Sequence, residues 1–414
     1  NELQVAILDK LLSAHKNLCV VGDDDQSIYG WRGANVKNIL EFNTRHKDTK
    51  VIKLENNYRS TENILQAAND LIAHNRTRHK KKLVSTLGEG SKIRILDSRD
   101  EVAEVSSVSR LIKEAIEDGV SANEIAVLFR INALSRSIEE GFLKEGIGFK
   151  MVDSIRFYER QEIKDVIAYL RLLSNMHDDF SFKRVVNKPR RGIGKTTLDK
   201  LEYGALEAGT SMFGFIMNSS VEGLQTIVSK KASKTLKDFC VMIDELSVSM
   251  VKADGDFLDE FEEMSGLRAM YKASNEAERV QNIDEFYALL REFLKQYPDD
   301  GIDQFLNDIA LSSEQDGLDG EQVSMMSVHA AKGLEFEMVF IIGLEDGFFP
   351  LMGDGSDLEE ERRLGYVAFT RAKRELILSH VNSRFFRGKR DFMQKSRFLS
   401  ESGVIKGSLK LAST

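Results

Sequence analysis

Acidic, aromatic and cationic side chains follow one another closely in the segment Val20–Ala34, which reads VVGDDDQSIYGWRGA. A short apolar run leads into the acids, as in a strand of an α/β domain that ends at a binding site. Tyr29, Trp31 and Arg32 offer flat rings and a cation, which suit the bases and phosphates of single-stranded nucleic acid. A lone tryptophan is more often a cap on a hydrophobic core, but the polar neighbours, among them Gln26, favour the binding interpretation.

Length and composition limit the class of protein. The 414 residues predict two or three domains, and 42% hydrophobic with 30% charged residues is typical of a soluble globular protein. The longest apolar run, Met338 to Ile342, is far too short to cross a bilayer, so no membrane partner is expected. Cys19 and Cys240 lie far apart and the seven histidines show no metal-ligand spacing. We therefore expect no disulfide framework and no bound metal among these residues, and a cytoplasmic location fits.

The formal net charge of −8 argues against a nucleic-acid partner if it is taken as a whole. Phosphate binding depends on a local basic groove, however, and not on the total charge. Three basic clusters are present, at Arg76–Lys82, Lys183–Lys195 and Arg384–Arg397. Each cluster is more often a solvated face than a DNA contact, so none decides the question.

The chain alternates between helix and strand patterns before about residue 160 and again after about residue 320. In the first part the patterns predict strands near Leu18–Val21 and Lys50–Leu54, a helix over 60–75, and a βαβ unit of a parallel sheet from Lys92–Asp97, Val102–Ile116 and Ile125–Arg130. In the last part they predict strands at Gln322–His329, Met338–Ile342 and Leu376–Ser379 and a helix at Leu358–Phe369. The residues between are almost all helical in pattern, which predicts an α/β domain interrupted by a helical insertion.

Four further segments carry polar residues in recognisable order. They read LENNYRST (Leu54–Thr61), KPRRGIG (Lys188–Gly194), VHAAKGLEFEMVF (Val328–Phe340) and EEERRLGYVAFTRAK (Glu359–Lys373). Together with the opening segment they closely resemble motifs III to VI, and the Gly-Ile-Gly element of the helical subdomain, of superfamily I DNA helicases of the UvrD/PcrA/Rep type. The resemblance covers essentially the whole chain, including FRINALSR and FYERQEIKD.

The resemblance implies an α/β fold of RecA-like, P-loop NTPase-type motor domains, the second interrupted by a mostly α-helical insertion subdomain. Residues 1–55 would be the C-terminal part of the first motor domain (1A). Residues 56–159 and 321–414 would be the two segments of the second (2A), and residues 160–320 the insertion (2B).

The resemblance also implies ATP and Mg²⁺ as cofactors. Arg59 and Arg371 match the two arginines that reach the γ-phosphate, where such a residue contributes about 10³–10⁵ in rate. Tyr58 matches the residue that stacks on adenine, Glu335 the one that contacts the sugar, and Gln26 the γ-phosphate sensor. Without the resemblance, a helix-start salt bridge for Arg59 and an ordinary surface ion pair for Arg371 would be the better interpretations.

Single-stranded DNA and its junctions with duplex are the partners that the resemblance implies, with repair or replication proteins as further candidates. The residues that match single-strand contacts are Tyr29, Trp31, Arg32, Arg130, Asn132 and His329. The residues that match a duplex contact are Arg191, Gly192 and Gly194, with Arg190 and Lys195 adding charge. Bare N–H groups at the two glycines could approach a phosphate.

Two segments imitate nucleotide-binding motifs. GIGKT (Gly192–Thr196) looks like the end of a phosphate-binding loop, but Pro189 stands where that loop needs glycine, and a strand must precede it. CVMIDEL (Cys240–Leu246) looks like a strand ending in Mg²⁺-binding acids, but its apolar residues follow helical spacing. We expect a loop of another kind and a buried helix face.

The sequence contains no G-x-x-x-x-G-K-[ST] and no strand-borne Asp-Glu-x-Gln. In the family both lie upstream of the position numbered 1 here, and the chain opens without Met inside an amphipathic helix pattern of Leu3, Ile7 and Leu11. We therefore expect a piece of a longer protein that does not hydrolyse ATP by itself. Leu3, Ile7 and the strand around Val20 would lack neighbours.

The leading hypothesis is an ATP-dependent DNA helicase and translocase that moves 3′ to 5′, in DNA repair or replication. One alternative is the motor part of a helicase–nuclease. Another is a non-catalytic DNA-binding truncated paralogue, although a pure binder would not need the nucleotide residues Gln26, Arg59, Glu335 and Arg371.

Overall fold

The structure is a computed structural model that describes residues 2–12, 17–30, 33–153, 156–252, 257–297, 301–314, 320–353, 356–386 and 389–405. The chain divides into two compact units, each described by itself below. Unit 1 comprises Asn1–Ser154, Leu318–Arg384 and Asp391–Thr414, and unit 2 comprises Ile155–Gly317 and Phe385–Arg390. The expected assignment of 1–55, 56–159, 160–320 and 321–414 to motor and insertion domains stays a prediction.

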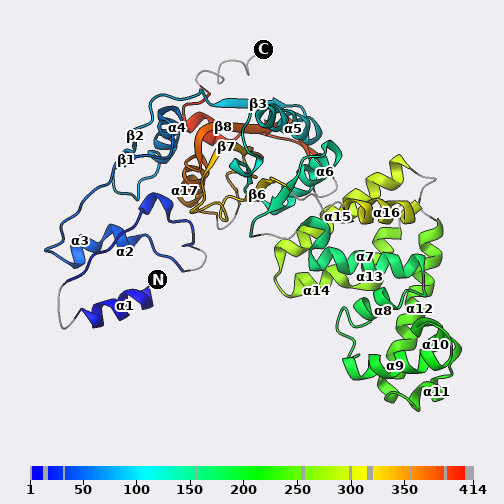
Figure 1. Cartoon of the computed structure of the whole chain (residues 1–414). Coiled ribbons are helices and arrows are strands. Elements are labelled where there is room, and N and C mark those ends of the chain that lie inside the picture. Colours follow the sequence, from blue (N-terminus) through cyan, green and yellow to red (C-terminus); the bar gives the residue numbers. More distant parts are fainter. Residues whose placement is uncertain are drawn as a thin grey trace. The chain divides into compact units, whose positions relative to one another are not determined.

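Unit 1 is built on a six-stranded sheet in the order β3-β8-β7-β4-β6-β5, with every neighbouring pair parallel (Figure 1). The strands are β3 (Arg94–Ser98), β4 (Ile125–Phe129), β5 (Phe149–Met151), β6 (Val323–Ser327), β7 (Phe336–Ile341) and β8 (Ala372–Val381). All five residues of β4 are buried, as expected for a central parallel strand covered on both faces. The predicted strands of this sheet are confirmed, but β7 and β8 separate the two strands of the predicted βαβ unit.

Helices cover the sheet and supply its core. They are α4 (Glu62–Ile72), α5 (Glu101–Glu117), α6 (Ser135–Glu145), α17 (Leu358–Phe369) and α18 (Arg397–Glu401), with short turns η3 (Ala122–Glu124) and η4 (Asn132–Leu134). Apolar residues of α4, α17 and α18 form one core with alternate residues of β4, β7 and β8. Helix α5 packs against β3, β8 and α6. A short two-stranded sheet of β9 (Ser383–Phe386) and β10 (Lys389–Phe392) follows the last strand of the large sheet.

The N-terminal segment contains α1 (Glu2–Leu11), η1 (Asp24–Gln26), α2 (Lys37–Leu40) and α3 (Phe42–Arg45), and β1 (Asn56–Asn57) pairs with β2 (Val84–Ser85). The predicted strands at Leu18–Val21 and Lys50–Leu54 are wrong: among the described residues, neither segment pairs with a strand. A strand is held by a neighbour's hydrogen bonds. Without one, Val21 and Leu54 are largely exposed, and so are Leu3 and Ile7 on the predicted helix α1.

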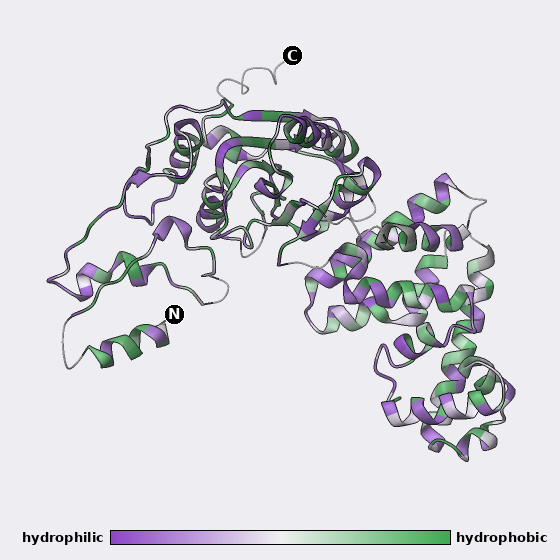
Figure 2. Ribbon diagram, viewed as in Figure 1, coloured by the Kyte–Doolittle hydropathy of each residue, from purple (hydrophilic) through white to green (hydrophobic). Residues whose placement is uncertain are grey.

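Unit 2 is helical throughout its long described segments. Its elements are η5 (Phe157–Glu159), α7 (Gln161–Ser174), α8 (Asp179–Val185), α9 (Lys195–Glu207), α10 (Met212–Asn218), α11 (Val221–Gln225), α12 (Lys230–Lys252), α13 (Phe257–Ser265), α14 (Leu267–Ala273), α15 (Ala277–Gln296) and α16 (Gly301–Glu314). Hydrophobic and hydrophilic residues alternate around these helices (Figure 2). Cys240, Ile243 and Leu246 of α12 are fully buried, which confirms the helical interpretation of CVMIDEL. Of the helices that the structure describes, none has the length and apolar character to cross a membrane.

Candidate functional site

The turn before α4 and the residues before β7 and β8 are distant in the sequence but lie side by side, at the amino-terminal ends of these two strands. The Asn57 side chain accepts hydrogen bonds from the backbone N–H of Arg59 and Ser60, both at 2.9 Å, and shapes the turn before α4. The Ser60 hydroxyl donates to the carbonyl of Ala372 at 2.6 Å. The N–H of Phe336 in turn donates to the carbonyl of Arg371 at 3.0 Å. The predicted nucleotide residues at 58–59, 335 and 371 therefore belong to one cluster.

Arg371 is the buried member of this cluster, with 2% of its surface exposed. Its guanidinium donates to the carbonyls of Val367 (3.0 Å) and Leu334 (2.9 Å) and to the hydroxyl of Thr370 (3.1 Å). No carboxylate among the described residues forms an ion pair with it. Burial, assisted by the charge of Arg59, lowers the pKa of Arg371 to about 10. The surface ion-pair interpretation of Arg371 is therefore wrong, because the side chain lies inside the unit and its hydrogen-bond partners among the described residues are all neutral.

Arg59 and Glu335 form the half-exposed rim of the same cluster. The Nε of Arg59 donates to Oε2 of Glu335 at 2.5 Å, and this hydrogen bond lowers the pKa of the Glu335 carboxyl. Lys373 lies farther from the same carboxylate, at 3.9 Å. Tyr58, next to Arg59, is 75% exposed, so its side chain is accessible to a planar partner. The cluster thus offers an exposed ring, a paired surface arginine and a buried arginine without a counter-ion.

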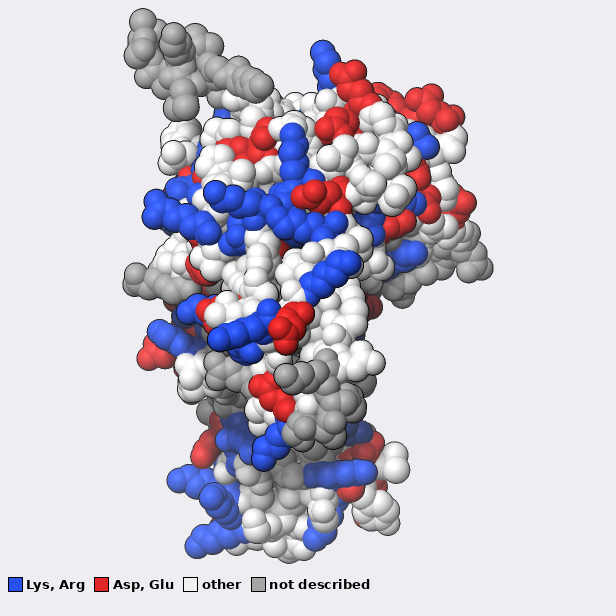
Figure 3. All heavy atoms as spheres, turned by 90° about the vertical axis from the view of Figure 1, so that its left-hand side faces the viewer, with Lys and Arg blue, Asp and Glu red and all other residues white. Residues whose placement is uncertain are grey.

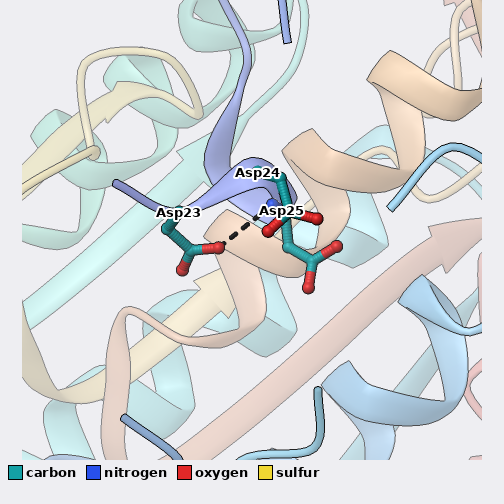
Figure 4. A group of neighbouring side chains, drawn as sticks. All are labelled: Asp23, Asp24 and Asp25. Atoms are coloured by element: carbon teal, nitrogen blue, oxygen red, sulfur yellow. Dashed lines mark hydrogen bonds between the residues drawn. The ribbon is translucent and has the colours of Figure 1, made fainter. Parts of the chain in front are cut away.

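The acidic turn Asp23–Asp25 is folded onto cations of the segment that follows α4. The three carboxylates lie within 4.8 Å of one another (Figure 4). Arg78 donates to both carboxylate oxygens of Asp25, at 2.8 and 2.7 Å, and Lys81 contacts all three acids. Burial disfavours the charge on Asp24, but the N–H of His79 and the ammonium of Lys81 outweigh it and lower the pKa of Asp24. Two cations thus offset most of the negative charge of the three carboxylates.

The cations of the predicted basic cluster Arg76–Lys82 therefore have two different environments. Arg78 and Lys81 face the acids, whereas Arg76, Lys80 and Lys82 are exposed. Figure 3 looks onto the side of the molecule that carries the N-terminal segment, and lysine and arginine side chains gather there in a band. Positive charge is thus concentrated locally in a chain of negative net charge.

Gln26, Tyr29 and His329 are brought together by Lys332. The Gln26 amide donates to Asp23 at 2.7 Å, and its backbone carbonyl accepts from Nζ of Lys332 at 2.9 Å. The same ammonium lies 5.2 Å from the centre of the Tyr29 ring. The Tyr29 hydroxyl donates to the carbonyl of His329 at 3.3 Å, and their ring centres are 6.2 Å apart. Lys332 therefore links Gln26, which is expected to sense nucleotide, to Tyr29, which is expected to contact DNA.

The remaining predicted single-strand contacts are not gathered in the same way. The guanidinium of Arg130 is held by Glu361 through three hydrogen bonds of 2.8 to 3.2 Å. Asn132 begins the short turn η4 and is half-buried. Trp31 and Arg32 lie outside the described residues. A DNA phosphate at Arg130 would have to compete with Glu361.

In unit 2 the predicted duplex contact is a turn that enters α9. Gly192 has a φ of +79°, a conformation that favours glycine, and a Cβ atom at either glycine would meet no atom within 4 Å. Within the described part of the chain, the N–H groups of Gly192 and Gly194 donate no hydrogen bond. Helix α8 and a turn precede this loop instead of a strand, so the rejection of a phosphate-binding P-loop is confirmed.

Arg191 is turned inward, away from the expected duplex side. Its guanidinium donates to the carbonyl of Lys188 at 2.8 Å and to the hydroxyl of Tyr169 at 3.1 Å, and it lies 5.0 Å from the centre of the Phe239 ring. Arg190 and Lys195 are the exposed cations of the loop. Arg191 therefore holds the loop together in this structure, and the charge offered to solvent comes from its neighbours.

The arrangement of these motifs on a parallel sheet and a helical unit agrees with comparisons with known proteins. The family model described as the UvrD-like helicase C-terminal domain matches residues 52–383, and the UvrD/REP helicase N-terminal domain model matches residues 1–47. The chain belongs to the UvrD-like helicase family. The parallel sheet of unit 1 is accordingly the sheet of a RecA-like motor domain.

This UvrD-like chain is similar to helicases named PcrA from several bacteria. It is 41% identical over 421 residues to the ATP-dependent DNA helicase PcrA of Bacillus subtilis (strain 168), which covers 97% of this chain and 56% of the relative. It is 38% identical over 417 residues to PcrA of Staphylococcus aureus (strain Mu50) and 39% identical over 413 residues to PcrA of Staphylococcus epidermidis (strain RP62A), with the same coverage. The chain thus spans about half the length of these relatives.

Several residues of the UvrD-like site were missed by reasoning from the sequence. The sequence places Arg78 and Lys81 only in a basic cluster, whereas in the structure they pair with the acidic turn. Lys332 stands three residues after His329 in a recognised motif, so its position was a usable signal. Asn187 precedes the KPRRGIG segment directly and accepts two hydrogen bonds from it. Nothing in the spacing of Asn187 indicates that role.

Proposed function

We propose that this chain is part of the motor of an ATP-dependent DNA helicase that moves 3′ to 5′ along single-stranded DNA and unwinds duplex, in DNA repair or replication. The observation that carries the proposal is the buried guanidinium of Arg371, which has neutral partners only and lies next to Arg59, Glu335 and an exposed Tyr58. A buried cation without a counter-ion is costly, and a phosphate would offset that cost.

The cluster fits ATP in charge and in shape. When bound, ATP supplies the phosphoryl group whose transfer releases the free energy for movement. Tyr58 offers an open ring to the adenine, and Glu335 offers a carboxylate to the sugar hydroxyls. Arg59 is paired with Glu335 at 2.5 Å, so it would exchange this carboxylate for a phosphate when nucleotide binds. Arg371 and Arg59 would then stabilise the negative charge of the phosphates.

Coupling of nucleotide to DNA would run through the acidic turn. Gln26 would sense the γ-phosphate, and its carbonyl is held by Lys332, which also lies against the ring of Tyr29. Tyr29 and His329 would contact single-stranded DNA together with Trp31 and Arg32. Base stacking contributes about 1–3 kcal/mol per base and is indifferent to sequence, as a motor that moves along any strand requires.

The residues present do not fit Mg²⁺. Asp23, Asp24 and Asp25 are close enough to share an ion, but all three contact Lys81, and Arg78 occupies both oxygens of Asp25. The sequence also contains no phosphate-loop lysine motif. We therefore propose that the chain does not hydrolyse ATP by itself and depends on a first motor domain for these anchors.

DNA-stimulated ATPase measurements on two proteins test the proposal. One is this chain, and the other is this chain joined behind the N-terminal motor segment of the Bacillus subtilis relative. We expect hydrolysis only in the fusion, and unwinding of duplexes with a 3′ single-stranded tail but not of duplexes with a 5′ tail. Single-strand binding without ATPase in a fusion whose N-terminal segment folds and binds ATP would favour a non-catalytic DNA-binding protein. Unwinding from 5′ tails would contradict the polarity.

A further inference from the structure

In the turn before α9, N–H groups that donate a hydrogen bond within the protein alternate with N–H groups that donate none among the described residues. The side-chain oxygen of Asn187 accepts the N–H of Arg191 at 2.7 Å and the N–H of Ile193 at 3.2 Å. The Ile193 side chain is buried in the core of unit 2. Gly192 and Gly194 stand between and after these anchored positions, and among the described residues their N–H groups have no acceptor. One amide therefore sets which N–H groups of the turn stay open.

The start of the same turn is anchored by a buried carboxylate. Asp165 of α7 is fully buried and accepts two hydrogen bonds from Nζ of Lys188, at 2.8 and 2.6 Å. It also forms an ion pair with Arg184 at 2.7 Å and accepts a hydrogen bond from the hydroxyl of Tyr271 at 3.1 Å. A buried carboxylate is tolerated when cations and hydroxyls satisfy its oxygens in this way. Lys188 thus joins the turn to α7, a helix most of whose residues are buried.

The inner side of the turn is closed by the guanidinium of Arg191. It binds the carbonyl of Lys188 and stacks over Phe239, and the hydroxyl of Tyr169 donates to the same carbonyl. Two cations of the KPRRGIG segment, Lys188 and Arg191, are therefore used inside the protein. The outer side keeps Arg190 and Lys195 together with the open N–H groups of the two glycines.

We propose that Asn187 and Lys188 are positioning residues for duplex binding, because they hold the turn in the one shape that presents the glycine N–H groups and the exposed cations to a single DNA phosphate. The inference rests on the proposed function and adds residues that touch no DNA. A turn that is already ordered loses less conformational entropy when it binds, so its affinity depends on the residues that order it. A neutral N–H pair without this order would bind a phosphate weakly.

Fluorescence anisotropy on the chain itself tests the inference. The probes are a blunt DNA duplex two helical turns long and an oligothymidine of equal length, each measured over a series of KCl concentrations. The variants are Asn187→Ala and Lys188→Met, and Asn218→Ala is the matched control because Asn218 is exposed at the end of α10 in the same unit. Amide hydrogen exchange of each variant reports whether the turn or the whole unit has loosened.

Both variants are expected to raise the duplex Kd about tenfold, which corresponds to the loss of about one good charged contact. The slope of log Kd against log salt concentration should fall by about 0.9, the amount expected for the loss of one phosphate contact. A merely structural role for the two residues would leave this slope unchanged. Exchange should rise at residues 190–194 and stay unchanged in α7 and α12, and oligothymidine binding should stay within about twofold of the parent, as for the control.

Three results would overturn the inference. One is faster amide hydrogen exchange in the turn with unchanged duplex affinity. Another is a tenfold loss of duplex affinity with an unchanged slope of log Kd against log salt concentration. The third is exchange that rises throughout unit 2, which would assign Asn187 and Lys188 to stability alone. If the parent chain binds neither probe, the DNA-binding part of the proposed function fails as well. If the parent binds duplex and the variants match it, only the positioning inference fails.

Discussion

Arg371 and Arg130 show how two predicted functional arginines differ in their surroundings. Arg130 has Glu361 as a bidentate partner, so its charge is already compensated. Arg371 donates to two carbonyls and a hydroxyl, and burial lowers its pKa. A cation of this kind gains most when an anion approaches, because the desolvation of the guanidinium has already taken place on folding.

Replacing Arg371 by alanine, in the fusion with a complete first motor domain, should reduce DNA-stimulated ATPase by about 10³ or more while single-strand affinity stays nearly unchanged. The matched control is Arg374→Ala, since Arg374 is close in sequence but exposed and paired with Glu337 at 3.1 Å. Steady-state ATPase and oligothymidine binding are the measurements. A loss of ATPase that accompanies loss of the folded state, seen by circular dichroism, would instead support a structural role for Arg371.

Pairing of β3 with β8 buries a histidine that the proposed chemistry does not use. His380 lies opposite Asp97 in the register of these strands and is fully buried. Within the described residues neither of its ring nitrogens has a hydrogen-bond partner, and the Asp97 carboxylate is 3.8 Å away. Burial lowers the pKa of His380, and Lys395 adds to this while Asp97 and Glu104 oppose it.

The pH dependence of stability follows from the sign of that shift. Because the folded protein disfavours the imidazolium, the unfolded chain binds more protons below the ordinary pKa of 6.5, and stability falls as pH falls from 6.5 toward the folded pKa. A tenfold weaker proton affinity of the folded protein costs about 1.4 kcal/mol, which is about 3–6 °C in Tm for a domain of this size. His380→Gln should flatten the Tm profile between pH 7.5 and 5, and the exposed His74→Gln should not. Equal slopes in all three proteins would contradict the assignment.

The elements that the sequence predicts correctly are those that pack against other described elements of their own unit. β4 and β7 are short apolar runs that become buried strands, and the helical spacing of Cys240, Ile243 and Leu246 becomes the inner face of α12. The runs at Leu18–Val21 and Lys50–Leu54 have the same local pattern, but a strand also needs a neighbour, and local pattern does not contain that information. Contacts between distant residues, such as Lys81 with Asp23, were likewise hidden.

At the scale of the whole molecule, the candidate site depends on segments from both ends of the chain. Motif resemblance predicts a nucleotide contact for Gln26 and DNA contacts for Tyr29 and His329. The contact between them became visible only in three dimensions, because Lys332 lies 306 residues from Gln26. Burial lowers the pKa of Lys332 and nearby Asp23 opposes that effect. Its ammonium binds a carbonyl and faces an aromatic ring, both of which favour the charged form.

Lys332→Met tests whether this contact transmits nucleotide state to DNA. Methionine keeps most of the apolar stem but loses the hydrogen bond to Gln26 and the charge over Tyr29, so the fold should persist while the two sites become independent. In the fusion with a first motor domain, we expect ATPase within about threefold of the parent and translocation about tenfold slower, so that more ATP is hydrolysed per nucleotide moved. Lys82→Met is the control, since Lys82 is exposed on the neighbouring segment. If ATPase and translocation fall by the same factor, Lys332 contributes to hydrolysis itself and the connection between sensor and DNA lies elsewhere.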